Sequence, residues 1–89
     1  MKKKIDIGGV EPLLFVGLKD KNLKVLENNF NSKIVVRGNS MNIDGKQAEI
    51  NHIETIVRHM LTLINKQGSL STEDINNLIS LDRLDDKKI

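Results

Sequence analysis

Residues 34–45 read Ile34-Val35-Val36-Arg37-Gly38-Asn39-Ser40-Met41-Asn42-Ile43-Asp44-Gly45. The first three are β-branched, and Met41 and Ile43 alternate with polar residues in the period of a half-buried strand. Gly38 and Asn39 accept the positive φ that a tight hairpin turn demands. The stretch therefore predicts a β-hairpin with strands over residues 33–37 and 41–44.

Helices are predicted on both sides of this hairpin. Upstream, apolar residues spaced i, i+3 and i+7 predict a helix over residues 20–29, and Asp20 is expected to cap its start. Downstream, helical spacing of apolar residues predicts a longer helix over residues 47–66. We expect Ile53, Val57 and Leu61 in its core-facing stripe. The full stripe comprises Ile50, Ile53, Val57, Met60, Leu61 and Ile64.

Two further elements complete the predicted fold. The apolar run over residues 13–16, bounded by Pro12 and Gly17, is short and predicts a third, buried strand. Ser71 precedes Asp74 by three residues, which predicts a short helix starting there. The element order is then β-α-β-β-α-α. We expect an α+β fold, KH-like, in which a small three-stranded sheet carries its helices on one face.

Length and composition limit the chain to one domain. At 89 residues it has room for a single core, placed here at residues 1–80, and residues 81–89 are interpreted as a charged tail or truncated linker. The sequence lacks cysteine, which favours a reducing compartment. Asp6 and two glycines interrupt the start where a signal peptide needs an apolar run. No stretch of about 20 apolar residues occurs. We expect a cytoplasmic protein that does not bind membranes.

The chain shows no catalytic constellation. His52 and His59 lie seven residues apart on the long helix, about 10 Å along its axis, which is too far for one metal ion. The acidic residues are explained by helix starts and solvation. Gly45-Lys46-Gln47 is only a near miss to a phosphate-binding P-loop, because a Gln replaces the hydroxyl that holds Mg²⁺. We therefore expect no catalytic residue, no metal site and no cofactor in this chain.

The order and spacing of several short phrases resemble the amino-terminal region of PhoH-like proteins, which are phosphate starvation-inducible. That family carries "G-x-x-D-x-N-L-x-x-L-E", an "I-x-x-R-G-N" hairpin, an "I-x-G" strand end and an "L-T-x-x-D" helix start. The resemblance covers roughly residues 13–79. The matching stretches here are Gly17-Leu18-Lys19-Asp20-Lys21-Asn22-Leu23-Lys24-Val25-Leu26-Glu27, Ile34-Val35-Val36-Arg37-Gly38-Asn39, Ile43-Asp44-Gly45 and Leu70-Ser71-Thr72-Glu73-Asp74.

The resemblance implies a KH-like accessory domain followed, in the longer protein, by a P-loop ATPase domain. ATP and Mg²⁺ are then expected only in that missing domain, so the parent protein is ATP-binding while this chain is not an enzyme. The expected partners are single-stranded RNA and the downstream ATPase domain. The resemblance also implies a homo-oligomer of the full protein.

An anion-binding site is predicted at the loop of residues 17–20. KH modules clamp a nucleic-acid backbone with a G-x-x-G loop between two helices, and the corresponding residues here are Gly17-Leu18-Lys19-Asp20. Lysines surround it, and residues 1–46 hold nine Lys/Arg against five Asp/Glu. Asp20 replaces the second glycine and would repel phosphate. The candidate residues are Gly17, Lys19, Lys21, Lys24 and Arg37.

Two functions remain open at this point. The first is weak RNA binding near the ATPase domain. The alternative is a protein-interaction or oligomerisation domain that packs on the ATPase core and has lost RNA binding, which Asp20 favours. The chain has only two aromatic residues, both expected in the core, so it lacks the stacking platform of many single-strand binders.

Overall fold

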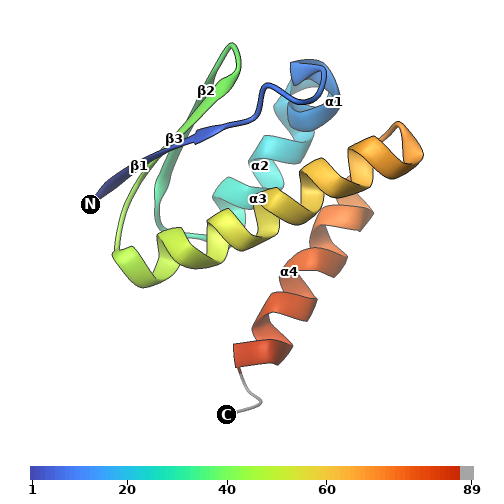
Figure 1. Ribbon diagram of the computed structural model, residues 1–89. Coiled ribbons are helices and arrows are strands. Elements are labelled where there is room, and N and C mark those ends of the chain that lie inside the picture. Colours follow the sequence, from blue (N-terminus) through green and yellow to red (C-terminus); the bar gives the residue numbers. More distant parts are fainter. Residues whose placement is uncertain (87–89) are drawn as a thin grey trace.

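The computed structural model describes residues 1–86, and the side chains of residues 1–84 (Figure 1). A five-residue helix and a short 3₁₀ turn precede the first long helix, and the last two elements are helices. In chain order the elements are β1 (Lys2–Asp6), α1 (Pro12–Val16), η1 (Leu18–Asp20), α2 (Lys21–Asn29), β2 (Lys33–Arg37), β3 (Ser40–Asp44), α3 (Gln47–Gln67) and α4 (Thr72–Asp86).

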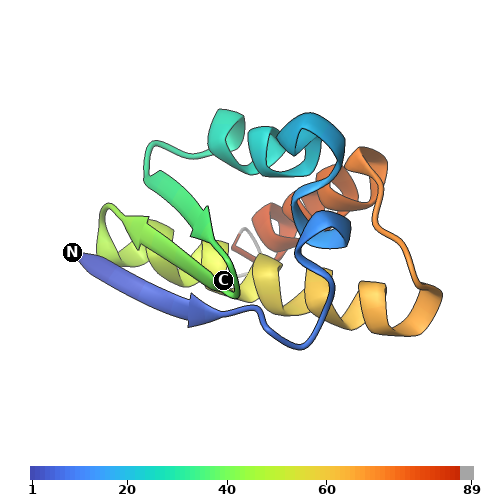
Figure 2. The same ribbon diagram turned by 90° about the horizontal axis from the view of Figure 1, so that it is seen from above.

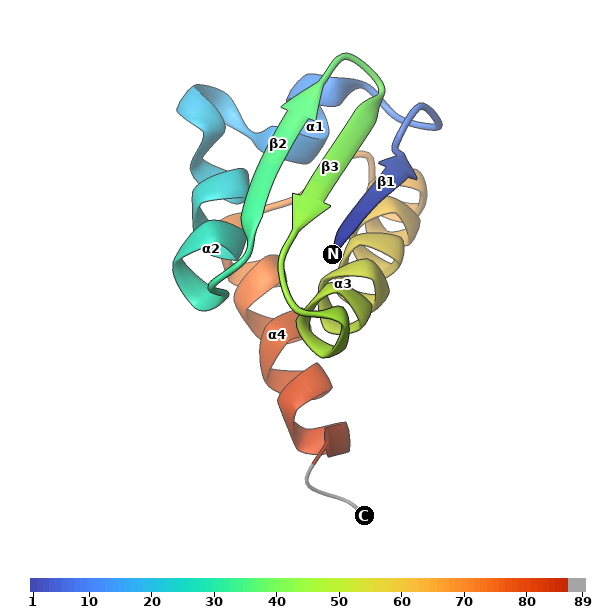
Figure 3. The same cartoon turned by 90° about the vertical axis from the view of Figure 1, so that its left-hand side faces the viewer.

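The three strands form one antiparallel sheet in the order β1-β3-β2. The hairpin of β2 and β3 is confirmed, with Ile34 opposite Ile43 and Val36 opposite Met41. Ile5 of β1 lies opposite Met41 on the other side of β3. These residues face the helices, all of which lie behind the sheet in Figure 3. The predicted arrangement of helices on one face of a three-stranded sheet is confirmed.

The strand predicted over residues 13–16 is wrong, because this run forms α1. Pro12 occupies the first helical turn, where its fixed φ suits a helix and its missing N–H is not needed. The N–H groups of Leu14 and Phe15 donate to the carbonyl of Glu11, at 3.0 and 3.3 Å. A short apolar run does not by itself distinguish a strand from a buried helical turn.

The third strand is β1, in a segment whose strand pattern is masked by lysines. Ile5 and Ile7 alternate with Lys4 and Asp6, and both isoleucines are buried. Lys3 shares their face, and its Nζ donates to Glu54 Oε1 on α3 at 2.9 Å. A charged residue on the helix-facing side therefore hides the alternation at the start of the chain.

The core lies between the sheet and the helices, with α3 contributing the most buried residues. Ile53 and Val57 are fully buried, as predicted, whereas Leu61 is only partly buried and packs at the margin. The prediction for Leu61 was wrong in degree, because the stripe turns towards Met60 and Ile64 in the last turns of the helix. Gly68 ends α3 at φ 75°, as its sequence position indicated.

The predicted start of α4 is confirmed, but its predicted end is not. The N–H of Asp74 donates to Ser71 Oγ at 3.1 Å, and the N–H of Ser71 donates to Asp74 Oδ2 at 3.0 Å. The same N–H of Ser71 lowers the pKa of Asp74. The helix continues beyond residue 80 to Asp86, so residues 81–86 of the expected charged tail or linker are helical. Residues 87–89 lie outside the described part.

Charged residues hold the last turns of α4 to the body. Asp82 Oδ2 lies 2.8 Å from His52 Nδ1 on α3, and Arg83 Nη2 lies 3.3 Å from Asn29 Oδ1 at the end of α2. In Figure 2 the helix lies between α2 and α3, both of which it contacts. These contacts explain why a charged segment with little to bury remains helical.

The fold is α+β and is consistent with the small KH-like fold that the sequence predicts. Consecutive helices α1 and α2 connect β1 to β2, and the β2–β3 hairpin leads into α3. Within residues 1–86, no helix combines the length and apolar character needed to cross a bilayer.

Candidate nucleic-acid interface

Residues 17–20 connect α1 to α2, so the loop joins two helices and not, as predicted, a strand and a helix (Figure 1). Gly17, Lys19 and Asp20 all have positive φ, at 79°, 55° and 59°. Two of these are not glycine, and a left-handed conformation is costly for such residues unless the surroundings impose it. Strained residues of this kind gather at binding loops, which makes this segment the leading candidate site.

Gly17 is required by both backbone conformation and space. Its φ of 79° and ψ of 166° belong to a region that is essentially reserved for glycine. A Cβ at this position would lie 2.9 Å from Asn22 Cγ. Asn22 is fully buried, and its Nδ2 donates to the carbonyl of Leu70 at 3.1 Å. The loop is thereby fixed against the α3–α4 connection.

Asn22 is a structural residue that sequence reasoning did not single out. Its Oδ1 is buried and accepts no hydrogen bond from the described residues. A buried asparagine near a helix start has no signature in hydrophobic periodicity, because the pattern marks it as a solvated position. The only signal was its place in the stretch of residues 17–27 that resembles PhoH-like proteins.

Asp20 does not cap α2 with its side chain, contrary to prediction. A capping residue takes an extended backbone conformation so that its side chain can reach the N–H groups of the first turn. Asp20 instead has φ 59° and ψ 25°, and no side-chain cap hydrogen bond forms. Its carboxylate is therefore exposed on the loop, where it opposes the nearby lysines.

The structure groups the predicted lysines around the loop. Lys19, Lys21 and Lys24 are all exposed, and the last two lie one helical turn apart on α2. The amino-terminal end of α2, a nine-residue helix, adjoins the same segment. Three exposed lysines and a helix start thus lie in or next to the segment that carries the exposed carboxylate of Asp20, a balance that suits a weakly bound anion.

Arg37 is not brought into this cluster. It lies at the end of β2, and its neighbour Val36 packs against the core. Because side chains alternate along a strand, Arg37 points to the open face of the sheet with Lys33 and Val35. The structure therefore separates it from the loop of residues 17–20.

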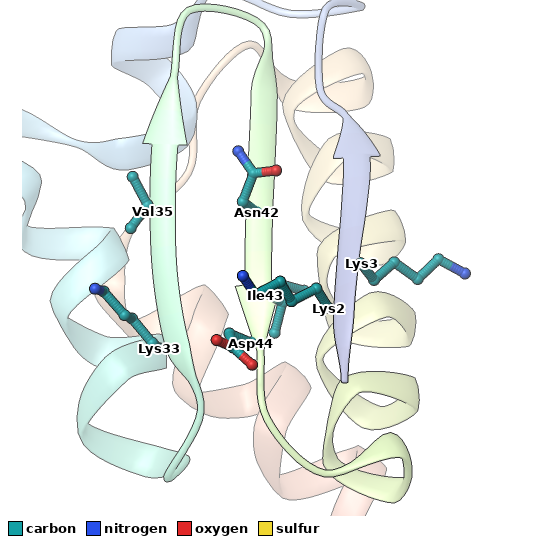
Figure 4. A pocket seen from close by; sticks show the side chains of 7 residues that line it. All are labelled: Lys2, Lys3, Lys33, Val35, Asn42, Ile43 and Asp44. Carbon is teal, nitrogen blue, oxygen red and sulfur yellow. The ribbon is translucent and has the colours of Figure 1, made fainter.

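The open face of the sheet carries a shallow hollow of about 250 Å³. Figure 4 shows Lys2 and Lys33 on its two sides with Asp44 between them, while Lys3 points away. The two aromatic residues lie elsewhere, with Phe15 in the core and Phe30 against it. This surface mixes charges of both signs without a stacking platform, as expected of the solvated face of an antiparallel sheet.

Besides Asp74, two carboxyl groups with a lowered pKa have structural partners. The side-chain hydroxyl of Ser32 donates to Glu49 Oε1 at 2.7 Å and lowers the pKa of Glu49. The ammonium group of Lys3 and the guanidinium of Arg58 lower the pKa of Glu54. Among residues 1–86, no group of three His, Cys, Asp or Glu side chains is placed to hold a metal ion.

The chain is similar to proteins described as PhoH-like from Mycobacterium bovis and Mycobacterium tuberculosis. Each is 28% identical over 75 residues, a match that covers 81% of this chain and 21% of theirs. The chain thus spans about a fifth of the length of these curated relatives. No protein-family model matches it. The similarity supports a relation to PhoH-like proteins.

Proposed function

We propose that this chain is a non-catalytic accessory domain of a PhoH-like protein and that it binds the phosphodiester backbone of single-stranded RNA. The observation that carries the proposal is the loop of residues 17–20, which joins two consecutive helices and is surrounded by three exposed lysines. KH modules use a loop in this position to clamp a nucleic-acid backbone. In the longer protein, ATP and Mg²⁺ are used by a separate P-loop domain.

Backbone contacts alone make this binding weak and strongly dependent on salt. The chain has no exposed aromatic platform, so stacking contributes little. Each lysine that neutralises a phosphate releases counterions, which links affinity to ionic strength. Asp20 opposes this attraction from within the loop.

A salt titration with charge-reversal variants tests the proposal. The affinity of the chain for a fluorescent oligouridine is measured at about 50 mM and about 200 mM salt. Lys19→Glu with Lys21→Glu should abolish most binding and reduce the log–log salt slope by about 1.4, the value for two lost single-strand phosphate contacts. A variant carrying Lys2→Glu and Lys33→Glu makes the same charge change on the open face of the sheet and should retain binding. Equal binding by the two double variants would contradict the proposal.

A protein-interaction function is the second candidate, and Asp20 favours it. An interface between proteins accommodates charges of both signs, whereas a phosphate chain does not. Asp20→Gly removes the repulsion and should strengthen RNA binding. If neither the wild type nor Asp20→Gly binds RNA at low salt, the protein-interaction function replaces RNA binding.

A further inference from the structure

Three leucines near the loop are exposed although they belong to an apolar segment. Leu13, Leu14 and Leu18 are 53%, 37% and 67% exposed. With Leu70 they form the apolar wall of a hollow of about 230 Å³, and Lys21 and Ser69 contribute its polar rim. We call this hollow, which these six residues and Gly17 line, the leucine groove.

The fold holds these leucines at the surface. Pro12 and Gly17 bound the single turn of α1, which directs Phe15 into the core and leaves Leu13 and Leu14 exposed. The bond from Asn22 Nδ2 to the carbonyl of Leu70 fixes the opposite wall. Isolated exposed leucines are ordinary, but a preformed apolar cluster beside a hollow marks a contact surface.

The dimensions and charges of the groove indicate the chemistry of its occupant. Its volume is smaller than the roughly 300–1,000 Å³ of pockets that enclose small-molecule ligands, so single side chains of a larger partner fit it better. Lys21 lines the hollow, and Lys19 follows Leu18 in the chain. With the exposed Asp20 between them, this edge carries two positive charges and one negative charge, a balance that favours carboxylates. An amphipathic helix with leucines three or four residues apart on one face presents such apolar side chains to a groove. Acidic residues that flank those leucines supply the carboxylates.

We propose that the leucine groove docks an acidic amphipathic helix of a partner protein. Aliphatic side chains of that helix enter the hollow, and its carboxylates pair with Lys19 and Lys21. The proposal deepens the protein-interaction function and does not depend on RNA binding.

A binding assay with a defined peptide tests the groove. The probe is a fluorescein-labelled helical peptide with leucine at i, i+4 and i+7 and glutamate at the remaining outer positions. Leu13→Ser with Leu18→Ser should weaken its binding by at least about tenfold, since the apolar wall is lost. Leu81→Ser with Leu84→Ser is the matched control, because these leucines of α4 are 57% and 55% exposed and should not affect binding.

Several outcomes would overturn the proposal. They are no saturable binding to the wild type, equal loss in both double variants, or equal binding of a peptide whose leucines are scrambled off one face. Sedimentation of the chain alone must show a monomer, because a dimer lost with Leu13→Ser and Leu18→Ser would assign the groove to a second copy. If that double variant fails to fold, Leu18→Ser alone replaces it.

The RNA proposal fails separately from this one. A variant carrying Leu13→Ser and Leu14→Ser, which changes the groove outside the loop of residues 17–20, should keep the RNA affinity of the wild type, because it retains the loop and every lysine. Loss of oligouridine binding without loss of peptide binding, or the reverse, identifies which of the two proposals is wrong. A leucine variant that lost RNA affinity and kept peptide affinity would assign the groove to nucleic acid.

Discussion

At the scale of single residues, Lys19 and Asp20 share a left-handed backbone conformation but carry opposite charges. Glycine adopts this conformation without strain, so Asp20→Gly and Lys19→Gly should each leave the free energy of unfolding unchanged or raise it by up to about 1 kcal/mol. RNA affinity should move in opposite directions, rising for Asp20→Gly and falling for Lys19→Gly. Urea unfolding measures the first quantity and fluorescence anisotropy the second. A loss above about 1 kcal/mol for Asp20→Gly would contradict the strained left-handed conformation of this residue, because glycine would relieve that strain.

Gly17 provides a test of the loop's backbone. Gly17→Ala should cost about 1–3 kcal/mol or more, because alanine is strained at φ 79° and its Cβ would lie 2.9 Å from Asn22 Cγ. Gly9→Ala is the control, since a Cβ there meets nothing within 4 Å. Thermal unfolding should give a lower melting temperature for Gly17→Ala than for Gly9→Ala. Equal melting temperatures would contradict the assigned conformation.

Some of the residues at the loop were predictable from the sequence, and others were not. The placement of Gly17 and the nearby lysines at a loop before a helix was predictable from the sequence motif of residues 17–27. The side-chain role of Asp20 was not, because capping depends on a backbone conformation that the residue type alone does not specify. Asn22 likewise requires three-dimensional contact with Leu70, 48 positions away, to explain its burial.

At the scale of elements, Glu49 of α3 secures the segment before β2. Its Oε1 accepts from the N–H and the hydroxyl of Ser32, at 2.6 and 2.7 Å. The folded pKa of Glu49 is lowered, so its contribution is present above the unfolded pKa and is lost as the pH falls through the folded pKa. Between about pH 5 and about pH 3, the stability of Glu49→Gln should therefore fall less than that of the wild type. Parallel stability curves would refute this role.

The core-facing stripe of α3 makes a graded prediction. Ile53→Ala should reduce the free energy of unfolding by about 2–5 kcal/mol, because the side chain is fully buried. Leu61→Ala should cost clearly less, since Leu61 packs at the margin of the core. Chemical denaturation of the two variants ranks them directly, and an equal or reversed order would mean that the stripe is misassigned.

A helix or strand was predicted correctly where residues close together in the sequence determine it. The β2–β3 hairpin and α3 carry clear periodicity and turn residues, and both were predicted correctly. The run over residues 13–16 was ambiguous between strand and helix, and β1 was hidden because Lys3 faces the helices. The last turns of α4 depend on contacts with α2 and α3, which no local pattern contains.

At the scale of the whole molecule, one sheet face is covered by helices and the other is open (Figure 3). The loop of residues 17–20 and the leucine groove both belong to the connection around α1, whereas Arg37 and the hollow beside Lys2 belong to the open face. The layered α+β arrangement was predictable from amphipathic patterns. The separation of Arg37 from the loop was not, because it depends on strand register.

The most direct test of the account is an NMR titration of the ¹⁵N-labelled chain with oligouridine at low salt. Amide signals of residues 17–24 should shift progressively, and the shifts should disappear at high salt and in the variant carrying Lys19→Glu and Lys21→Glu. Signals of β1 and of the open face of β2 should remain in place. Shifts centred on the open face, or none at any RNA concentration, would contradict the assignment of RNA binding to the loop.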